Sequence, residues 1–394
     1  MPKPRFRRLT HAVAILSLIL AMPATSPAQL ERGTAASVGM SEKQLEAAAA
    51  ILAAQVKSGP ISAAAIAVAR RNKIVMARGF GKLAHDAGSP DVDADSIFLL
   101  ASITKPVTAS ALMILVDRGL ISLDDPVAQY IPEFQGGERA QVSVRKLLSH
   151  ISGLPDMLPQ NTDLRRANAP LSEFVAGAAT TPLLYSPGTN FRYQSMGILL
   201  AAEIVERVSG KRLRDFEKAE MFDPLGMKHS ALGMGGWKLS ETVWVEESPN
   251  ANQANSKRFG ANSAYWRDMG HPWGGMHSSA LDLAILLQTM LNRGEYGGKR
   301  VFSQAAVAAM TADQNRSVKA PWGLGWGLRD SLVWNFFGEL VSEKTFGHTG
   351  ATGTVFWADP ERDLLCVILT NRMVENGRLL RRVSNAVAAA VEDE

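Results

Sequence analysis

A serine and a lysine stand three residues apart in the stretch Ala101-Ser102-Ile103-Thr104-Lys105-Pro106, at the start of an apolar run. Positions i and i+3 of a helix share a face, so the Lys105 amine can reach the Ser102 hydroxyl. An amine that burial holds neutral can accept the hydroxyl proton and so turn a weak nucleophile into a strong one. The pair therefore predicts a serine nucleophile beside its base.

The same spacing occurs again at Ser143 and Lys146, so Ser-x-x-Lys alone is a weak signal. Ser143 is better interpreted as the N-cap of a short helix. After Lys105, apolar positions recur at helical spacing until residues 117–119, which predicts a helix with Pro106 in its first turn. Other stretches must decide whether Ser102 is catalytic.

The second stretch with chemical potential is Phe191-Arg192-Tyr193-Gln194-Ser195, which precedes a predicted helix over 196–205. A phenol carried into a cleft beside Lys105 could shuttle protons, because the ammonium stabilises a phenolate. Taken alone, Tyr193 is more typical of a half-buried structural tyrosine.

The third stretch is the glycine-rich run Phe346-Gly347-His348-Thr349-Gly350-Ala351-Thr352-Gly353. It predicts an edge strand whose glycines let a substrate backbone approach closely. The His348 side chain and the Thr349 hydroxyl would then be donors aimed into a cleft. The alternative is a tight turn before the last hairpin.

In this order, the three stretches resemble the serine β-lactamase and penicillin-binding protein superfamily, in its class C-like branch of D-peptidases and esterases. Its members carry Ser-x-x-Lys, then Tyr-x-Asn or Tyr-x-Ser, then Lys-Thr-Gly or His-Thr-Gly. Here the motifs stand as Ser102-Ile103-Thr104-Lys105, Tyr193-Gln194-Ser195 and His348-Thr349-Gly350. The run Leu-Leu-Ser-His-Ile-Ser-Gly-Leu-Pro at 147–155 and the Gly-Trp run at 323–327 extend the resemblance over nearly all of the chain after residue 28.

This resemblance implies a mechanism. Ser102 attacks a carbonyl to form an acyl-enzyme, with Lys105 and Tyr193 as the acid/base pair, and which of the two takes the first proton stays open. The oxyanion hole is formed by the backbone N–H groups of Ser102 and Ala351. The implied substrate-binding residues are Ser195, His348, Thr349 and Gly350. No cofactor is implied, and the seven histidines include no His-Glu-x-x-His pairing for a metal.

Two departures from the β-lactamase pattern bear on the substrate. Ser195 replaces an asparagine whose amide holds a substrate carbonyl, and a hydroxyl reaches less far. His348 replaces a lysine that meets a substrate carboxylate, and an unpaired histidine is largely neutral at neutral pH. Both departures weaken a β-lactamase interpretation, because His-Thr-Gly resembles the D-peptidase members and the serine variant is seen among the esterases.

The elements that must position these residues predict an α/β (α+β) fold of β-lactamase/transpeptidase-like type. Its antiparallel sheet is flanked by the terminal helices, and a mostly helical lobe is inserted. Residues 29–394 form one hydrolase domain, with a sheet lobe at about 29–100 and 320–394 and a helical lobe at about 101–319. The predicted strands are 62–69, 73–80, 355–358 and 364–369, and the predicted terminal helices that flank the sheet are 42–57 and 376–391.

Residues 231–275 are rich in Gly, Ser, Asn and Trp and show little periodicity. Such a segment is either a lid or pocket wall, or a plain surface excursion, and the sequence does not separate the two. If the pocket binds an ester, the tryptophans of this segment at 237, 244 and 266 could line the pocket.

Residues 1–28 predict a cleavable signal peptide, since four basic residues precede the apolar run 12–22 and a small-residue site ends at Ala28. The protein is then periplasmic or secreted, through the general or the twin-arginine route. Without those four, residues 29–394 carry 38 basic and 38 acidic residues. Their formal net charge is therefore zero, which gives no electrostatic argument for nucleic-acid binding. The only cysteine, Cys366, lies in an apolar run, so we expect no disulfide and no lipid anchor.

The sequence thus predicts an exported serine hydrolase that cleaves an amide or ester bond through an acyl-serine. Small peptides, with D-residues among the candidates, are favoured over simple esters by a little. The alternatives are a carboxylesterase, then a β-lactamase, and, from another class, a non-catalytic binding protein on the same fold. The partner is a small molecule or short peptide, and the oligomeric state stays open.

Overall fold

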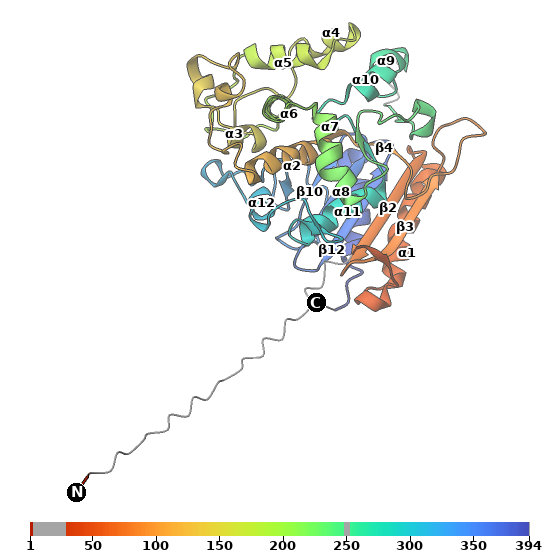
Figure 1. Ribbon diagram of the computed structural model, residues 1–394. Helices are drawn as coiled ribbons and strands as arrows, with labels where there is room; N and C mark the ends of the chain where they lie inside the picture. The colour runs from red at the N-terminus through yellow and green to blue at the C-terminus, as the bar shows by residue number, and fades with distance from the viewer. Residues whose placement is uncertain (3–28, 248–252, 394) are drawn as a thin grey trace.

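The computed structural model describes residues 1–2, 29–247 and 253–393 (Figure 1). The predicted signal peptide lies outside the described residues, except for its first two positions. In Figure 1 the helical elements in yellow and green lie above a sheet whose strands are orange and blue, so both ends of the described chain contribute to the sheet.

One seven-stranded sheet organises the fold. Its spatial order is β1 (Glu31–Arg32), β3 (Lys73–Gly81), β2 (Ala63–Arg70), β12 (Leu364–Thr370), β11 (Thr354–Asp359), β10 (Phe346–Gly350) and β9 (Gly327–Leu328). The short β1 pairs parallel to β3, and the other neighbours are antiparallel. The register of β12 on β2 joins strands about 300 residues apart, which confirms the prediction that strands from the two ends of the chain share one sheet.

Alternate residues of the central strands feed two hydrophobic cores. On one face, Ala64, Ile66 and Val68 pack with helices α1 (Glu42–Ser58) and α13 (Arg378–Ala388), which also contact each other. Cys366 is fully buried in this core, as expected. The terminal helices therefore cover one face of the sheet, as predicted.

Helix α11 (Ala280–Leu291) packs on the opposite face, against β2, β11 and β12. The side chain of Ser279 caps it by accepting the N–H of Asp282 at 3.2 Å. The predicted helical lobe, residues 101–319, includes α11, but α11 covers the sheet. An apolar helix needs an apolar partner, and the open sheet face supplies one.

The helical part of the molecule is built around α2 (Thr104–Asp117), whose residues 104–115 are all buried. Its main partner is α6 (Ser195–Ser209). The chain returns against α2 at Gly325, where an added Cβ would lie 2.2 Å from the Ala109 Cβ, so this contact requires glycine. The other helices are α3 (Val144–Leu148), α4 (Asn161–Arg166), α5 (Leu171–Thr180), α7 (Leu213–Glu217), α8 (Asp223–Leu225), α9 (Gln253–Phe259), α10 (Ala264–Met269) and α12 (Gln304–Met310).

A small sheet joins the two parts of the fold. It has the order β4 (Phe98–Leu99), β6 (Met276–Ser278) and β5 (Ala231–Leu232). A separate two-stranded sheet pairs β7 (Glu295–Tyr296) with β8 (Lys299–Arg300). Because β4 ends just before Ala101, the small sheet determines where the stretch with Ser102 begins.

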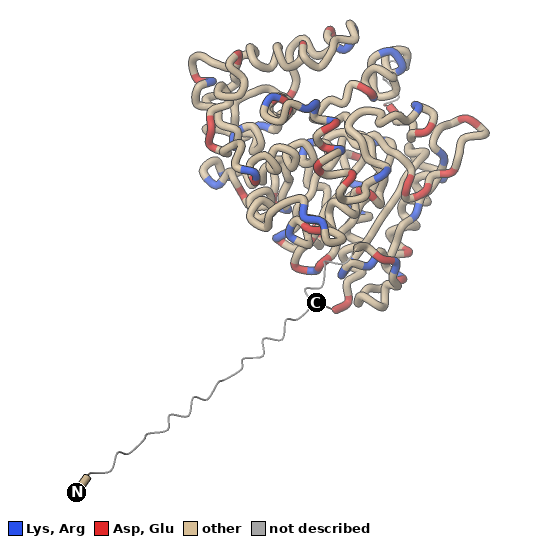
Figure 2. The backbone as a smooth tube through the Cα atoms, viewed as in Figure 1, with Lys and Arg blue, Asp and Glu red and all other residues tan. Residues whose placement is uncertain are grey.

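The surface carries mixed charge: Figure 2 shows Lys and Arg interspersed with Asp and Glu along the visible backbone. Within the described ranges, no helix is long and apolar enough to cross a bilayer. The same ranges contain no group of three or more His, Cys, Asp or Glu residues that could hold a metal ion.

Candidate active site

Ser102 and Lys105 meet as their spacing predicts. Ser102 lies in the 3₁₀ turn η2 (Ala101–Ile103), which leads into α2, and side chains at i and i+3 of such a turn are eclipsed. The Nζ of Lys105 donates to the Ser102 Oγ at 3.0 Å and to the carbonyl of Trp273 at 2.9 Å. Lys105 is 1% exposed, so its amine faces the serine in a nearly dry environment.

The backbone before the serine is strained. Ala101 has φ +51°, a left-handed conformation that an alanine rarely adopts. The side chain of Thr104 holds it there, because its Oγ1 donates to the Ala101 carbonyl at 2.7 Å and accepts the Met276 N–H of β6 at 3.0 Å. Strain of this kind persists where the surrounding structure imposes it, and here it sets the direction of the Ser102 side chain.

Burial makes Lys105 a candidate base. Removal from water disfavours the ammonium form and lowers the pKa of Lys105 to about 7, although the nearby carboxylate of Asp156 opposes this shift. At neutral pH the neutral amine is therefore a major species, which an exposed lysine would not provide.

Tyr193 lies in the same site. The Lys105 Nζ is 4.8 Å from the centre of the Tyr193 ring, and the phenol oxygen is 3.5 Å from the Nε2 of His348. Burial raises the pKa of Tyr193 well above its ordinary value, and Asp156 raises it further, while the nearby Ser102 hydroxyl opposes the rise. Tyr193 is therefore a phenol at neutral pH, suited to hold or donate a proton.

The run 147–155 positions Tyr193. The ring of His150 packs 4.8 Å from that of Tyr193, and its Nδ1 accepts the Gln194 N–H at 3.4 Å. The Gln194 side chain also lies 2.7 Å from the Ser152 hydroxyl. Trp322 closes the arrangement with its ring 5.8 Å from that of Tyr193. The sequence offered no role for this run, and the structure shows it as the support of the tyrosine.

Strand β10 brings Ala351 towards the serine. An added Cβ on Gly350 would lie 2.0 Å from the Leu100 carbonyl oxygen, so only glycine permits this approach. Thr352 and Thr354 fix it, because their hydroxyls donate to the carbonyls of Leu99 and Leu100, both at 2.8 Å. The strand is thereby tied to the two residues that lead into η2, and Ala351 follows it directly.

His348 and Thr349 are both fully buried in β10. Desolvation, assisted by Lys105, lowers the pKa of His348 to about 3, so it is a neutral imidazole. The Thr349 Oγ1 accepts the Phe336 N–H at 3.3 Å and keeps its own hydrogen for donation. The prediction of an edge strand is wrong for the first part of β10, because Phe346 and Gly347 pair with β9.

Ser195 is accompanied by a carboxylate that the sequence analysis missed. The Ser195 Oγ donates to Asp156 Oδ1 at 2.7 Å, and the Ser195 N–H donates to the Asp156 carbonyl at 3.2 Å. Asp156 directly follows the 147–155 run. That position was the available signal, but an aspartate after a Gly-Leu-Pro turn is too common to stand out.

Near the end of the 231–275 run, the Trp273 carbonyl accepts from Lys105, so this part of the run lies at the site. The tryptophans that contact Tyr193 are Trp322 and Trp334, with ring centres 5.8 and 5.7 Å away. Trp266 packs instead on His271, 4.1 Å between ring centres. The structure therefore gives no support to the prediction that the tryptophans at 237, 244 and 266 line the pocket. Their spacing in the sequence does not indicate which indole rings lie close together.

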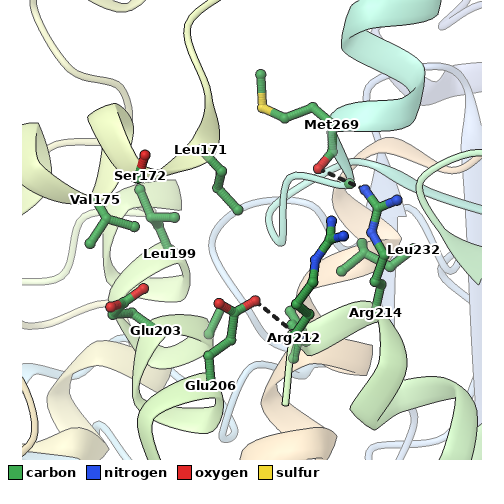
Figure 3. A pocket seen from close by; sticks show the side chains of 13 residues that line it. Leu171, Ser172, Val175, Leu199, Glu203, Glu206, Arg212, Arg214, Leu232 and Met269 are labelled. Atoms are coloured by element: carbon green, nitrogen blue, oxygen red, sulfur yellow. Dashed lines mark hydrogen bonds between the residues drawn. The ribbon is translucent and has the colours of Figure 1, made fainter. Parts of the chain in front are cut away.

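A separate hollow of about 110 Å³ lies between α5, α6 and the end of α10. Figure 3 shows Leu171, Leu199 and Val175 on one side and Arg212 and Arg214 on the other, with Arg214 donating to the Met269 carbonyl at 3.1 Å. None of the candidate catalytic side chains lines it. The active site is therefore identified by its chemistry and not by the depth of this hollow.

Beneath the site, Glu217 is fully buried, with Oε1 3.4 Å from the Thr108 hydroxyl. Its Oε2 has no hydrogen-bond partner among the described residues. Desolvation raises the pKa of Glu217 to about 8, so folding forces this carboxyl to take up a proton at neutral pH.

Glu217→Gln is accordingly expected to stabilise the protein at pH 7 by about 1 to 3 kcal/mol. The folded-state pKa lies above the unfolded value, so the parent loses stability as pH rises from about 4.5 to 8. Urea unfolding of both proteins at pH 5.5 and 7.5 should show a larger difference at the higher pH. An equal effect at both pH values would contradict a protonated Glu217.

Comparisons with known proteins identify the family. A model of the family described as Beta-lactamase matches residues 48–390. A protein of Escherichia coli (strain K12), provisionally named D-alanyl-D-alanine carboxypeptidase, is 30% identical over 337 residues, which cover 77% of each chain.

Two solved structures resemble the fold. A penicillin-binding protein homologue from Caulobacter crescentus superposes with a TM-score of 0.74 at 24% identity, covering 89% of this chain and 99% of that one. A family VIII carboxylesterase superposes with a TM-score of 0.69 at 24% identity, with the same coverage of both chains. At such identities the likeness shows the fold alone.

Proposed function

The chain belongs to the Beta-lactamase family and is a serine hydrolase, and from that premise we propose that Ser102 cleaves a small amide or ester through an acyl-serine intermediate. The observation that carries the proposal is the 3.0 Å hydrogen bond between the nearly dry Lys105 amine and the Ser102 hydroxyl. A neutral amine at that distance is placed to accept the hydroxyl proton as the oxygen attacks.

In the proposed acylation step, the Ser102 Oγ bonds to the substrate carbonyl carbon while its proton passes to the Lys105 Nζ. The backbone N–H groups of Ser102 and Ala351 receive the oxyanion, a kind of stabilisation worth about 3 to 4 kcal/mol per donor. The Tyr193 phenol donates a proton to the leaving nitrogen or oxygen and regains one from the Lys105 ammonium. Water then attacks the ester carbonyl and gives a proton to the Lys105 Nζ. The bond between the carbonyl carbon and the Ser102 Oγ breaks, the acid leaves, and the proton passes from Lys105 to the Ser102 Oγ, which restores the free serine and the neutral amine.

Lys105 is proposed as the first base because its pKa is about 7, whereas that of Tyr193 is raised well above 10. A group is an efficient base when its pKa lies near the working pH. The sequence left this choice open, and the two burial environments favour the lysine.

The proposed substrate is a small molecule or short peptide, with an amide favoured over a simple ester. The neutral imidazole of His348 offers no permanent charge for a substrate carboxylate. A carboxylesterase is the second candidate, because the rings of Trp322 and Trp334 beside Tyr193 give the site an apolar side. Export to the periplasm or medium is part of the proposal and is supported by the composition of residues 1–28.

Covalent labelling tests the proposal. The mature protein is incubated with a fluorescent alkyl phosphonate, and its intact mass is compared with that of Ser102→Ala. We expect one adduct on the parent protein, mapped to the peptide with Ser102, and none on the variant. If folded parent protein stays unlabelled by phosphonates and penicillins alike, the enzyme proposal fails, and a binding protein on this fold takes its place.

A further inference from the structure

Asp156 places a negative charge beside the proposed nucleophile. It is half-buried, and its carboxylate lies close enough to Lys105 and Tyr193 to raise the pKa of both. Its Oδ1 accepts from the Ser195 hydroxyl at 2.7 Å. For Oδ2, the described part of the chain supplies no hydrogen bond, and no lysine, arginine or histidine there forms an ion pair with Asp156.

This charge works against the chemistry around it. A carboxylate near Lys105 favours the ammonium form, which cannot accept a proton, and it also makes the Tyr193 proton harder to release. A cation bound against Asp156 offsets this effect on both groups.

The hydrogen-bonding capacity of the site points the same way. The Ser195 hydroxyl spends its hydrogen on Asp156, so its free lone pairs can only accept. The free oxygen of Asp156 is also an acceptor. Where an asparagine amide would donate to a substrate carbonyl, this chain presents acceptors and a negative charge. The matching substrate group is a positively charged donor of several N–H bonds.

We propose that Asp156, held by the buried Ser195, binds a protonated amine on the acyl side of the substrate, such as the free α-amine of an amino-acid amide or a short peptide. Ser195, which holds Asp156, begins α6 two residues after Tyr193, so the amine would bind on the Tyr193 side of the proposed site. This inference rests on the proposed acyl-serine function and narrows it to amine-bearing substrates.

The test compares kcat/KM for alanine p-nitroanilide, as D and L isomers, with the N-acetylated forms. For the parent protein we expect a preference of at least tenfold for the free amine in one isomer. Asp156→Asn keeps an acceptor for the Ser195 hydroxyl but removes the charge, and it should reduce the preference to about threefold or less. The matched control Asp163→Asn removes an exposed carboxylate on α4, paired with Arg166, and should leave the preference unchanged.

A second measurement needs no variant. Alaninamide and N-acetylalaninamide are compared as inhibitors of 4-nitrophenyl acetate hydrolysis by the parent protein, and the free amine should inhibit at least tenfold more strongly. Equal inhibition by the two amides would overturn the proposal, and so would a preference that persists in a folded Asp156→Asn.

The two levels of the proposal fail differently. If 4-nitrophenyl acetate acylates the parent protein but not Ser102→Ala, the hydrolase function stands whatever the amine experiments show. If Asp156→Asn slows neutral and amine-bearing substrates by the same factor, Asp156 is a support for Ser195 and not an amine site. No acylation by the neutral ester would remove the function on which the inference rests.

Discussion

Lys105→Ala is expected to lower kcat/KM for an activated ester by about 10³-fold at pH 8, because general base catalysis contributes on that order. The Lys105 amine is buried and donates to Ser102 at 3.0 Å. A water molecule could take its place only in the cavity that the substitution leaves. Steady-state kinetics of both proteins measure the loss, and circular dichroism confirms that the variant is folded.

The pH dependence of the parent protein follows from the same group. The base is the neutral amine, so kcat/KM should rise with pH through a midpoint near 7 and level off above about 8. The residual activity of Lys105→Ala should lack this rise. Five titratable groups lie around Lys105. The carboxylate of Asp156 raises the pKa of Lys105, and the other four side chains are neutral at pH 7: Tyr193, His150, His271 and His348.

The second Ser-x-x-Lys copy supplies the control. Lys146 lies on α3, and its Nζ donates to the Gln141 carbonyl at 2.7 Å, away from the proposed chemistry. Lys146→Ala should change kcat/KM by less than about threefold, as expected for a surface substitution. If both alanine variants lose activity to a similar extent, or neither does, Lys105 is not the base.

Gly350→Ala is expected to lower kcat/KM by about 10²- to 10³-fold, the effect of losing one oxyanion-hole donor. The added Cβ would lie 2.0 Å from the Leu100 carbonyl oxygen and 2.3 Å from the Thr354 Oγ1, so β10 must move away from η2. That movement would displace the Ala351 N–H from its proposed position in the oxyanion hole. The clash should also lower the free energy of unfolding by about 1 to 3 kcal/mol.

Gly88→Ala is the matched control, because an added Cβ there meets no heavy atom within 4 Å. Its kinetics and urea midpoint should equal those of the parent protein. To separate the two effects of Gly350→Ala, phosphonate labelling is measured at a temperature where urea titration shows the variant folded. A folded variant that is labelled at the parent rate would rule out the proposed place of Ala351 in the oxyanion hole.

The neutral imidazole of His348 offers no permanent charge for a substrate carboxylate. Among the described residues of the site, Asp156 instead carries a negative charge that has no ion-pair partner. Family membership alone therefore does not determine the substrate, and the amine experiments test this point directly.

The sequence by itself determined the family, the order of the three motifs and the pairing of Ser102 with Lys105. These features are local, because an i, i+3 spacing brings two side chains together in any helical turn. The strands of the sheet were also predictable, since β2, β11 and β12 are short apolar runs bounded by turn residues. The terminal helices were predictable from the helical spacing of their residues.

Only the tertiary structure decided which distant groups complete the site. The Trp273 carbonyl, the Asp156 carboxylate and the Trp322 ring reach Lys105 and Tyr193 from segments 37 to 168 residues away. Backbone carbonyls leave no mark in a sequence, and burial, which lowers the pKa of Lys105 and of His348, depends on all neighbours at once. The periodicity of the sequence indicates which face of an element is apolar, but not which element covers that face. The proposed identity of the base and the charge of the site therefore depend on packing.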